Sequence, residues 1–270
     1  GAQPVLIHFA FAALIVSLAC GAQRPPRLRE EAYVWQRAWT PNVVAAVRAH
    51  GGSFDGLRVL ALELDQRGTL AVAGSPAVVS GQRVVPVIRV DGSRIVDVDA
   101  LVDEAHHVIE RFRAAGVNVT ALEIDHDCAS SQLQSYANAI RALKASVDVP
   151  VQITALPSWA PSKSLADLVA ASDATTLQVH AIDRAVGLFD ARRARAAVDA
   201  FAKRMPANKP LWIALPAYGV DSVAGGTSWA NPVDVDAFLR GLARDRPAHV
   251  RGVVWFRLPV DGDGGGWSFA

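Results

Sequence analysis

Three acidic side chains alternate along one short and otherwise apolar stretch of the chain. Glu123, Asp125 and Asp127 are separated only by Ile124 and His126. Successive side chains of a β-strand point to opposite faces, so a strand here would present all three carboxylates on one face. Repulsion among close carboxylates raises at least one pKa, and a carboxyl group that keeps its proton can act as a general acid.

The same test of strand parity predicts which other side chains share an interior with these carboxylates. Polar positions of each strand-like segment are taken to face inward, and apolar positions to face a layer of helices. In the last strand this places Val254, Phe256 and Leu258 outside. The predicted inward side chains are Trp35, Arg37, Trp39, Glu63, Arg89, Gln152, Thr154, Gln178, His180, Trp255 and Arg257. They gather towards the C-terminal strand ends, where barrel enzymes carry their chemistry.

The elements that must position these side chains alternate between strand and helix patterns. Short β-branched runs predict strands at 33–39, 58–64, 84–90, 121–127, 151–156, 175–181, 211–216 and 251–258. Apolar residues at three-and-four spacing predict helices at 42–50, 98–115, 131–146, 164–171, 191–205 and 233–244. The segment 65–81 contains three glycines and a proline and predicts a loop.

Eight strands with helical crossovers indicate an α/β fold, a (β/α)₈ TIM barrel. An open doubly wound sheet is the alternative, although no glycine-rich phosphate loop follows the first strand. The eighth strand is followed by too few residues for an eighth outer helix, so we expect a truncated C-terminus.

The N-terminal residues predict export. Residues 5–20 are apolar apart from His8 and Ser17, and this run is shorter than the about 20 residues of a membrane span. Ala19-Cys20 before a polar, proline-rich stretch resembles the lipobox of bacterial lipoproteins, in which Cys20 carries the lipid. A buried N-terminal helix, or a signal peptide in which Cys20 is incidental, are the alternatives. We expect an export or lipoprotein signal at 1–20, a tether at 21–30 and one barrel domain at 31–270, in a periplasmic or membrane-anchored bacterial lipoprotein.

Composition argues against several classes of protein. The 27 basic and 26 acidic residues give a formal net charge of +1, and no run of like charges suggests a nucleic-acid partner. Two cysteines are too few for a disulfide framework or a cysteine-rich zinc site. We expect no cofactor, and membrane contact only through an N-terminal lipid anchor. A metal site formed by Asp125, Asp127 and His180 remains an alternative, although no spacing requires it.

Three segments resemble the glycoside hydrolase family 18 barrels. Residues 119–127 resemble the fourth-strand signature DGxDxDxE, and residues 215–219 and 252–256 resemble segments of the seventh and eighth strands. The resemblance places Asp127 on the catalytic glutamate, with Glu123 and Asp125 on the second and third aspartates. The signature's first aspartate is replaced by Thr120, and Gln178-Val-His-Ala181 stands where the family has Met-x-Tyr-Asp.

The whole chain is more similar to a bacterial family known only as domain of unknown function 3142. The segments that carry this likeness are residues 33–40, 123–128, 154–159, 177–180 and 256–259. That family implies a fold and no activity.

Two functions from different classes follow. The first is a glycosidase for an envelope or extracellular polysaccharide, either N-acetylated or plain. There Asp127 is the general acid, and the family 18 resemblance implies attack by the substrate's acetamido group, steadied by Asp125. Tyr218 and His180 would hydrogen-bond the sugar, and Trp35, Trp159 and Trp255 would stack on it. The second is a barrel that binds a glycan without cleaving it. Glu63, Arg89, Arg37 and Arg257 are either ligand-binding residues or a buried ion-pair network.

Overall fold

Parallel strands close into a barrel in the structure, a computed structural model that describes residues 27–66, 68–72, 74–93, 96–182, 187–221 and 227–262. The eight barrel strands are β1 (Arg29–Val34), β2 (Gly56–Asp65), β4 (Arg83–Val90), β6 (Leu122–His126), β7 (Val151–Ala155), β8 (Ala174–Gln178), β9 (Leu211–Pro216) and β12 (Val250–Phe256). Closure is made by β12, which pairs in parallel with β1. The predicted (β/α)₈ barrel is confirmed.

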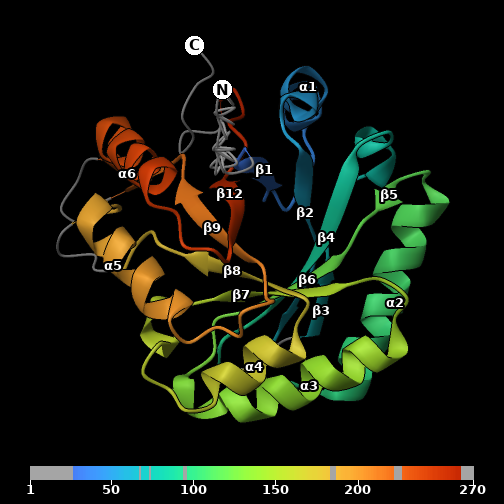
Figure 1. Ribbon diagram of the computed structural model, residues 1–270. Helices are drawn as coiled ribbons and strands as arrows, with labels where there is room; N and C mark the ends of the chain where they lie inside the picture. Colours follow the sequence, from blue (N-terminus) through green and yellow to red (C-terminus); the bar gives the residue numbers. More distant parts are fainter. Residues whose placement is uncertain are drawn as a thin grey trace, which may run out of the picture.

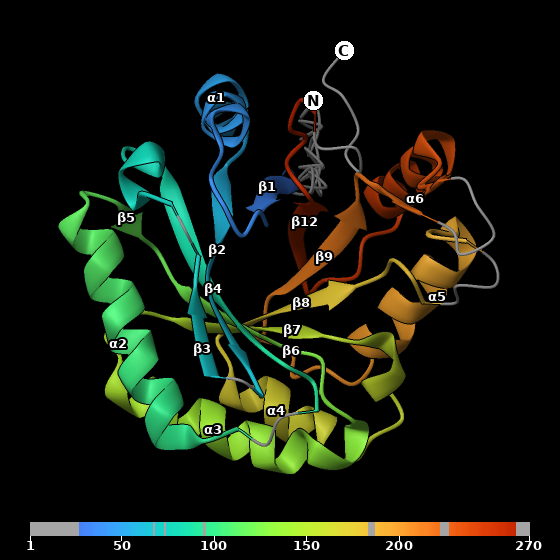
Figure 2. The same cartoon turned by 180° about the vertical axis from the view of Figure 1, so that it is seen from behind.

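Helices lie on the outside of these strands (Figure 1). They are α1 (Pro41–His50), α2 (Val98–Ala114), α3 (Leu133–Ser146), α4 (Leu165–Ala171), α5 (Ala191–Ala202) and α6 (Pro232–Arg244). The view from behind shows α2 beside β4 and α5 beside β8 and β9 (Figure 2). Their starts follow from capping: the Asp97 side chain accepts from the Ala100 amide, and Asn231 precedes a first-turn proline. Within the described ranges no helix follows β12, and none combines the length and apolarity needed to cross a bilayer.

The remaining elements are short. β5 (Asn118–Val119) extends the pairing of β4, and β10 (Gly219–Asp221) and β11 (Thr227–Trp229) form a separate two-stranded sheet. Single 3₁₀ turns are η1 (Gly51–Ser53), η2 (Pro76–Val79), η3 (Ser130–Gln132) and η4 (Pro157–Trp159). The segment predicted as loop between β2 and β4 contains η2 and a further strand, β3 (Gly68–Ala71), which folds back antiparallel onto β2.

The first strand begins and ends earlier than the sequence predicts. It runs from Arg29 to Val34, whereas the β-branched and aromatic pattern predicts 33–39. Its first two residues, Arg29 and Glu30, lie within the predicted tether but belong to the barrel strand. The next residue is Glu31, whose carboxylate is buried against Arg58 inside the barrel. Parity is nevertheless as predicted, because Trp35 continues the inward face of Glu31 and Tyr33.

One extra residue in β2 changes its alternation. Leu60 pairs with Val87 but Leu62 pairs with Ile88, so Ala61 is an additional residue, a β-bulge. Arg58 and Glu63 have opposite parity in the sequence, yet both face the interior because the bulge lies between them. The prediction for Glu63 is confirmed, and Arg58 is an interior side chain that strict alternation places outside.

The parity predicted for the eighth strand is wrong. Val254 and Phe256 pack inside the barrel with Tyr33 and Trp212, whereas Trp255 faces outward and donates its indole N–H to Glu30 Oε2 at 3.2 Å. Both faces of β12 are apolar, so its alternation carries no information about direction. The direction follows from its register with β1, which pairs Val254 with inward-facing Glu31.

Gly252 lies where the interior of β12 meets the Trp212 ring. A Cβ atom added there would lie 2.5 Å from the ring and would also overlap the Arg29 carbonyl oxygen. Gly252→Ala is therefore expected to lower the free energy of unfolding by about 1–3 kcal/mol, the usual cost of overpacking a filled core. Urea denaturation would measure it. Gly52→Ala is the control, since nothing lies within 4 Å of the added atom, and equal stability of the two variants would contradict the prediction.

Candidate functional site

The floor of the barrel is a fully buried ion cluster formed by Glu31, Arg58 and Glu123. Arg58 Nε donates to Glu31 Oε2 at 2.9 Å, and its Nη1 donates to the Glu123 carboxylate and to Thr176 Oγ1, the latter at 2.6 Å. Tyr33 Oη donates to the other Glu123 oxygen at 2.6 Å. Two carboxylates hold the pKa of Arg58 above its ordinary range despite burial. Glu123 is completely enclosed and does not border the pocket above it, so its role here is structural.

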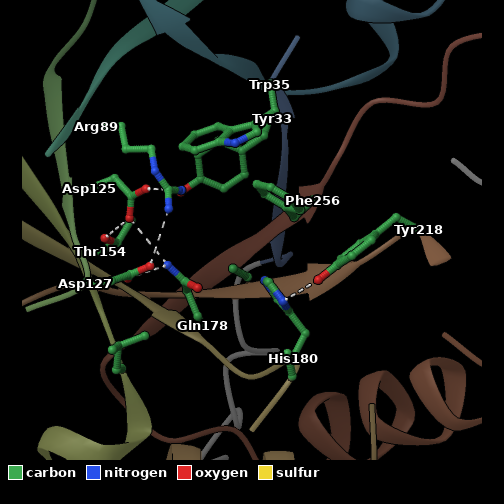
Figure 3. Close-up of a pocket in the computed structure, with 13 residues that line it drawn as sticks. Tyr33, Trp35, Arg89, Asp125, Asp127, Thr154, Gln178, His180, Tyr218 and Phe256 are labelled. Carbon is green, nitrogen blue, oxygen red and sulfur yellow. Dashed lines mark hydrogen bonds and ion pairs between the residues drawn. The ribbon is translucent and has the colours of Figure 1, made fainter. Parts of the chain in front are cut away.

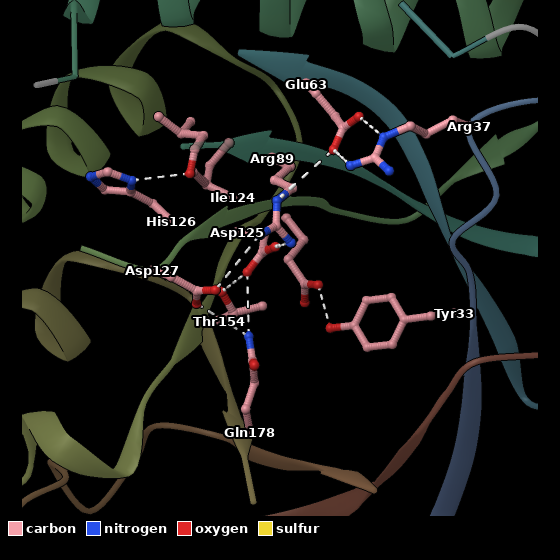
Figure 4. Close-up of polar contacts among 12 residues, drawn as sticks. Tyr33, Arg37, Glu63, Arg89, Ile124, Asp125, His126, Asp127, Thr154 and Gln178 are labelled. Atoms are coloured by element: carbon pink, nitrogen blue, oxygen red, sulfur yellow. Dashed lines mark hydrogen bonds and ion pairs between the residues drawn. The ribbon is translucent and has the colours of Figure 1, made fainter. Parts of the chain in front are cut away.

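Asp125 is the next inward-facing residue of β6 after Glu123, and it lies between the floor and the pocket (Figure 4). It is 2% exposed and accepts hydrogen bonds from Thr154 Oγ1 at 2.6 Å and Arg89 Nη1 at 3.3 Å. Burial is the main cause that raises the pKa of Asp125 to about 7, and the charge of Asp127 adds to it while Arg89 opposes it. Asp125 can therefore hold a proton near neutral pH.

Asp127 follows the end of β6 and borders the pocket. Its side chain is 36% exposed, and Oδ1 accepts from Gln178 Nε2, which lies 3.4 Å from both Asp127 and Asp125. Burial raises the pKa of Asp127, although Arg89, 4.0 Å away, opposes the shift. The two aspartates thus share one amide donor and one guanidinium, which makes their titrations interdependent.

The raised pKa of Asp125 predicts how stability depends on pH. Between its ordinary pKa of 3.8 and its folded pKa of about 7, the folded chain keeps a proton that the unfolded chain releases. Stability is therefore expected to fall as pH rises through this window. Asp125→Asn removes the titration, so its melting temperature should fall less than the wild-type value between pH 4.5 and pH 7.5, which thermal scans in both buffers would show.

Exposed Asp103 on α2 provides the matched control, because Asp103→Asn removes a carboxylate that lies at the surface. Its pH profile should overlay that of the wild type. An unchanged slope in Asp125→Asn would show that Asp125 titrates normally in the folded protein.

The pocket above Asp125 has a volume of about 320 Å³ (Figure 3). One side carries Asp125, Asp127 and Gln178, and the other is aromatic. His180 stacks on Phe256 at 5.5 Å, and its Nδ1 lies 3.1 Å from Tyr218 Oη. Burial lowers the pKa of His180 to about 4, so the ring is neutral at pH 7. Its Nε2 is buried and has no hydrogen-bond partner in the described ranges, which leaves one polar atom for a ligand.

Half of the residues predicted to face the interior or to bind a ligand border this pocket. Those that border it are Trp35, Arg89, Asp125, Asp127, Thr154, Gln178, His180 and Tyr218. Glu63 accepts from Arg37 Nη2 at 2.9 Å and lies 3.9 Å from Arg89 Nε, so these three form an ion-pair network beside the pocket (Figure 4). Arg37 and Arg257 border a second cavity of about 560 Å³, which shares Trp35 with the first.

Several predicted ligand contacts are not formed. Trp159 is 1% exposed and belongs to the core between the strands and helices, so it offers no stacking surface. Trp255 points outward and Arg257 does not border the pocket, because the inward and outward faces of β12 are exchanged relative to the prediction. Gln152 faces inward but pairs in register with Glu123, at the level of the floor. Trp39 also lies away from the pocket, with its ring over Gly74.

Sequence reasoning missed Tyr33, Arg58 and Phe256. Arg58 is the only charged residue between Gly56 and Leu62 of β2, and an isolated arginine in an apolar strand is itself a signal of an interior ion pair. The bulge at Ala61 concealed its direction. Tyr33 and Phe256 are apolar in pattern and gave no separate signal.

The backbone that carries the aspartates is held from the outer side by three aromatic side chains. Tyr136 Oη donates to the Ile124 carbonyl oxygen at 3.0 Å, and Trp159 Nε1 donates to the Cys128 carbonyl oxygen at 3.0 Å. His126 Nδ1 lies 3.2 Å from the Val90 carbonyl oxygen of β4, and its ring packs edge-on against Tyr136. His126 is therefore a packed residue, as its outward parity predicts.

No group of three histidine, cysteine, aspartate or glutamate side chains is arranged to hold a metal ion among the residues that the structure describes. Asp125, Asp127 and His180 border the same pocket, but Tyr218 occupies one nitrogen of His180. The only cysteine in the described part of the chain, Cys128, is buried, which raises its pKa to about 11.

The model of the family described as domain of unknown function (DUF3142) matches residues 80–231, more than half of the chain. The chain belongs to the DUF3142 family. A comparison with curated proteins finds no match.

Solved structures show where the DUF3142 barrel stands among known folds. It is similar to a chitinase from Bacteroides thetaiotaomicron, with a TM-score of 0.67, 12% identity, and 86% of this chain and 90% of that chain covered. The spore cortex-lytic enzyme SleL of Bacillus cereus gives a TM-score of 0.59 at 11% identity, covering 86% and 71%. A protein described as a xylanase-A-amylase inhibitor gives 0.55 at 15% identity, covering 86% and 93%. At these identities the likeness is one of fold, and each of the three structures shares the barrel of this chain.

Proposed function

We propose that this DUF3142 protein is a glycosidase that acts on an envelope or extracellular polysaccharide, with Asp127 as general acid. The observation that carries the proposal is the pair of interacting aspartates with raised pKa, placed at the C-terminal strand ends beside an aromatic wall. A protonated carboxyl group at the pocket can donate its proton to a glycosidic oxygen. Trp35 offers an aromatic face, and Gln178 and His180 offer polar atoms for a sugar.

The proposal extends to the roles of the two aspartates. Asp127 is the more exposed, so it lies where a leaving oxygen would be. Asp125 is buried beneath it and would steady charge on a substrate group above it. In the family 18 resemblance that group is the substrate's own acetamido oxygen, which makes N-acetylated sugars the first substrates to test.

Export belongs to the same proposal. A polysaccharide outside the cytoplasm requires an exported enzyme, and the apolar run at residues 5–20 with Cys20 supplies a signal and a lipidation site. Both lie outside the described residues. Mass spectrometry of the mature protein from its native host tests this part, and a mature chain that still contains residues 5–19 would contradict it.

A screen of the full chain against N-acetylated and plain oligosaccharides tests the activity. We expect chain-shortened products from at least one N-acetylated substrate, separated by chromatography and identified by mass. The alternative function, a barrel that binds a glycan without cleaving it, is favoured by the shorter reach of Asp127 compared with glutamate. Calorimetric binding of an oligosaccharide with no product after prolonged incubation would establish that alternative.

A further inference from the structure

A third cavity, also bordered by charged side chains, lies at the opposite end of the barrel from the pocket that holds Asp127. It has a volume of about 450 Å³ and is bordered by Arg27, Arg244, Arg246 and Arg251, which together we call the basic pocket. Arg251 is near the start of β12, Arg27 precedes β1, and the other two arginines lie at and after the C-terminus of α6. The pocket that holds Asp127 lies at the C-terminal strand ends, so the two cavities are on opposite faces of the barrel.

The charges around the basic pocket do not balance. The carboxylate of Asp245, which also borders it, lies 2.7 Å from Arg195 Nη2, and Arg27 pairs with Asp55 at 2.7 Å. Arg251 donates to the Ala248 carbonyl oxygen at 2.8 Å and has no carboxylate partner within the described ranges. Arg244 and Arg246 form no ion pair or hydrogen bond with any residue that the structure describes.

Three guanidinium groups therefore surround one cavity without neutralisation, in a chain whose net charge is only +1. Arg246 is half-buried, so it has lost part of its hydration without gaining a protein partner. Planar guanidinium groups pair with phosphate oxygens through two parallel hydrogen bonds, and several around one cavity make a site for phosphate. The sequence does not reveal this cluster because Arg27 lies far from residues 244–251 in the chain.

We propose that the basic pocket binds phosphate groups, and that in the anchored protein these are the headgroups of anionic phospholipids. The chain enters the barrel at Arg27, seven residues after Cys20. Even fully extended, that linker spans at most ~25 Å. A lipid on Cys20 would therefore keep the Arg27 end of the barrel close to the bilayer, while the pocket that holds Asp127 faces away from it. The arginines of the cavity are sufficient to argue for phosphate binding. The assignment of that phosphate to a phospholipid headgroup rests on the proposed lipid anchor at Cys20.

Vesicle binding by the full chain tests this assignment. Co-sedimentation is measured with phosphatidylcholine vesicles and with vesicles that also contain about 30 mol% phosphatidylglycerol, at ~0.1 M salt. The apolar N-terminal run contributes to binding on both surfaces, so the ratio of the two partition coefficients isolates the contribution of charge. We expect the wild type to prefer the anionic vesicles. Arg244→Gln/Arg246→Gln should reduce that preference by about fivefold for each arginine removed.

The control is Arg113→Gln/Arg141→Gln, which makes the same change in net charge on exposed faces of α2 and α3. Its preference for anionic vesicles should remain near the wild-type value. Equal losses in both double variants, or no loss in Arg244→Gln/Arg246→Gln, would overturn the site.

Titration with inorganic phosphate separates the two sources of the ligand. If phosphate binds the wild type but not Arg244→Gln/Arg246→Gln, while neither vesicle is preferred, the cavity is a site for soluble phosphate and the membrane assignment is wrong. Displacement of the chain from anionic vesicles by a short DNA duplex at equal phosphate concentration would also overturn it. None of these measurements depends on glycosidase activity, so their outcome is independent of the proposed reaction.

Discussion

Asp127→Asn is expected to lower kcat/KM for a natural oligosaccharide by ~10²–10⁴-fold, the range that a general acid contributes. Asparagine keeps the size and the contact with Gln178 but has no proton to give to the leaving oxygen. The wild-type rate should fall as pH rises above the pKa of the Asp125–Asp127 pair, because the acid is then ionised. Initial rates on the substrate found in the screen, measured from pH 5 to 9, give both quantities.

A change of leaving group makes this test specific for acid catalysis. In a 4-nitrophenyl glycoside the leaving group is 4-nitrophenolate, which departs without being protonated. Asp127→Asn should therefore lose much less activity on this substrate than on the natural one. Exposed Asp236 on α6, whose carboxylate pairs with Arg240, is the control, and Asp236→Asn should keep full activity on both substrates. Equal losses on the two substrates would assign Asp127 to binding, and full activity on both would remove it from the mechanism.

Arg58→Met is expected to destabilise the fold by about 3–5 kcal/mol, the usual cost of breaking a buried ion pair from one side. The variant leaves two buried carboxylates, Glu31 and Glu123, without their shared counter-charge. Tyr33 and Thr176 still donate to Glu123, but they do not neutralise it. The melting temperature should fall by roughly 10 °C, and urea denaturation would give the free energy of unfolding.

Two further variants identify the cause. Arg240→Met removes an exposed partner of Asp236, so it should leave the free energy of unfolding close to the wild-type value. Adding Glu123→Gln to Arg58→Met removes one of the stranded charges, and it should recover part of the lost stability. A double variant no more stable than Arg58→Met would show that packing of the arginine against Trp212, 5.1 Å away, matters more than its charge.

The strand order and the acidic interior could be predicted from the sequence because polar and apolar residues alternate clearly where one face of a strand is polar. In β6 the outward face carries Leu122 and Ile124, and in β8 it carries Leu177. Asp125 and Gln178 both lie on the opposite, inward face, where parity places them. Strand parity does not indicate which face is inward where both faces of a strand are apolar. In β12, residues 253 and 254 are both valine, and only the pairing with β1 shows that Phe256 rather than Trp255 faces inward.

Long-range contacts account for the rest. The charges of Arg29 and Glu30 placed the start of β1 in the predicted tether. The ion pair of Glu31 inside the barrel gave no local signal, since its partner Arg58 is distant in sequence and hidden by the bulge in β2. Trp159 lies just beyond a strand end, which suggested a sugar-stacking surface. Its actual contact is the Cys128 carbonyl oxygen beneath the helical layer, and a local pattern does not indicate such a partner.

The aromatic groups behind β6 have a consequence for the free energy of ligand binding. Tyr136, Trp159 and His126 already hold the backbone on both sides of Asp125 and Asp127 before any ligand arrives. Binding of a ligand therefore does not have to offset the loss of conformational entropy on ordering that strand, and more of the contact energy remains as affinity. The proton donor keeps a fixed position relative to the bond it acts on, which is the preorganisation that catalysis requires.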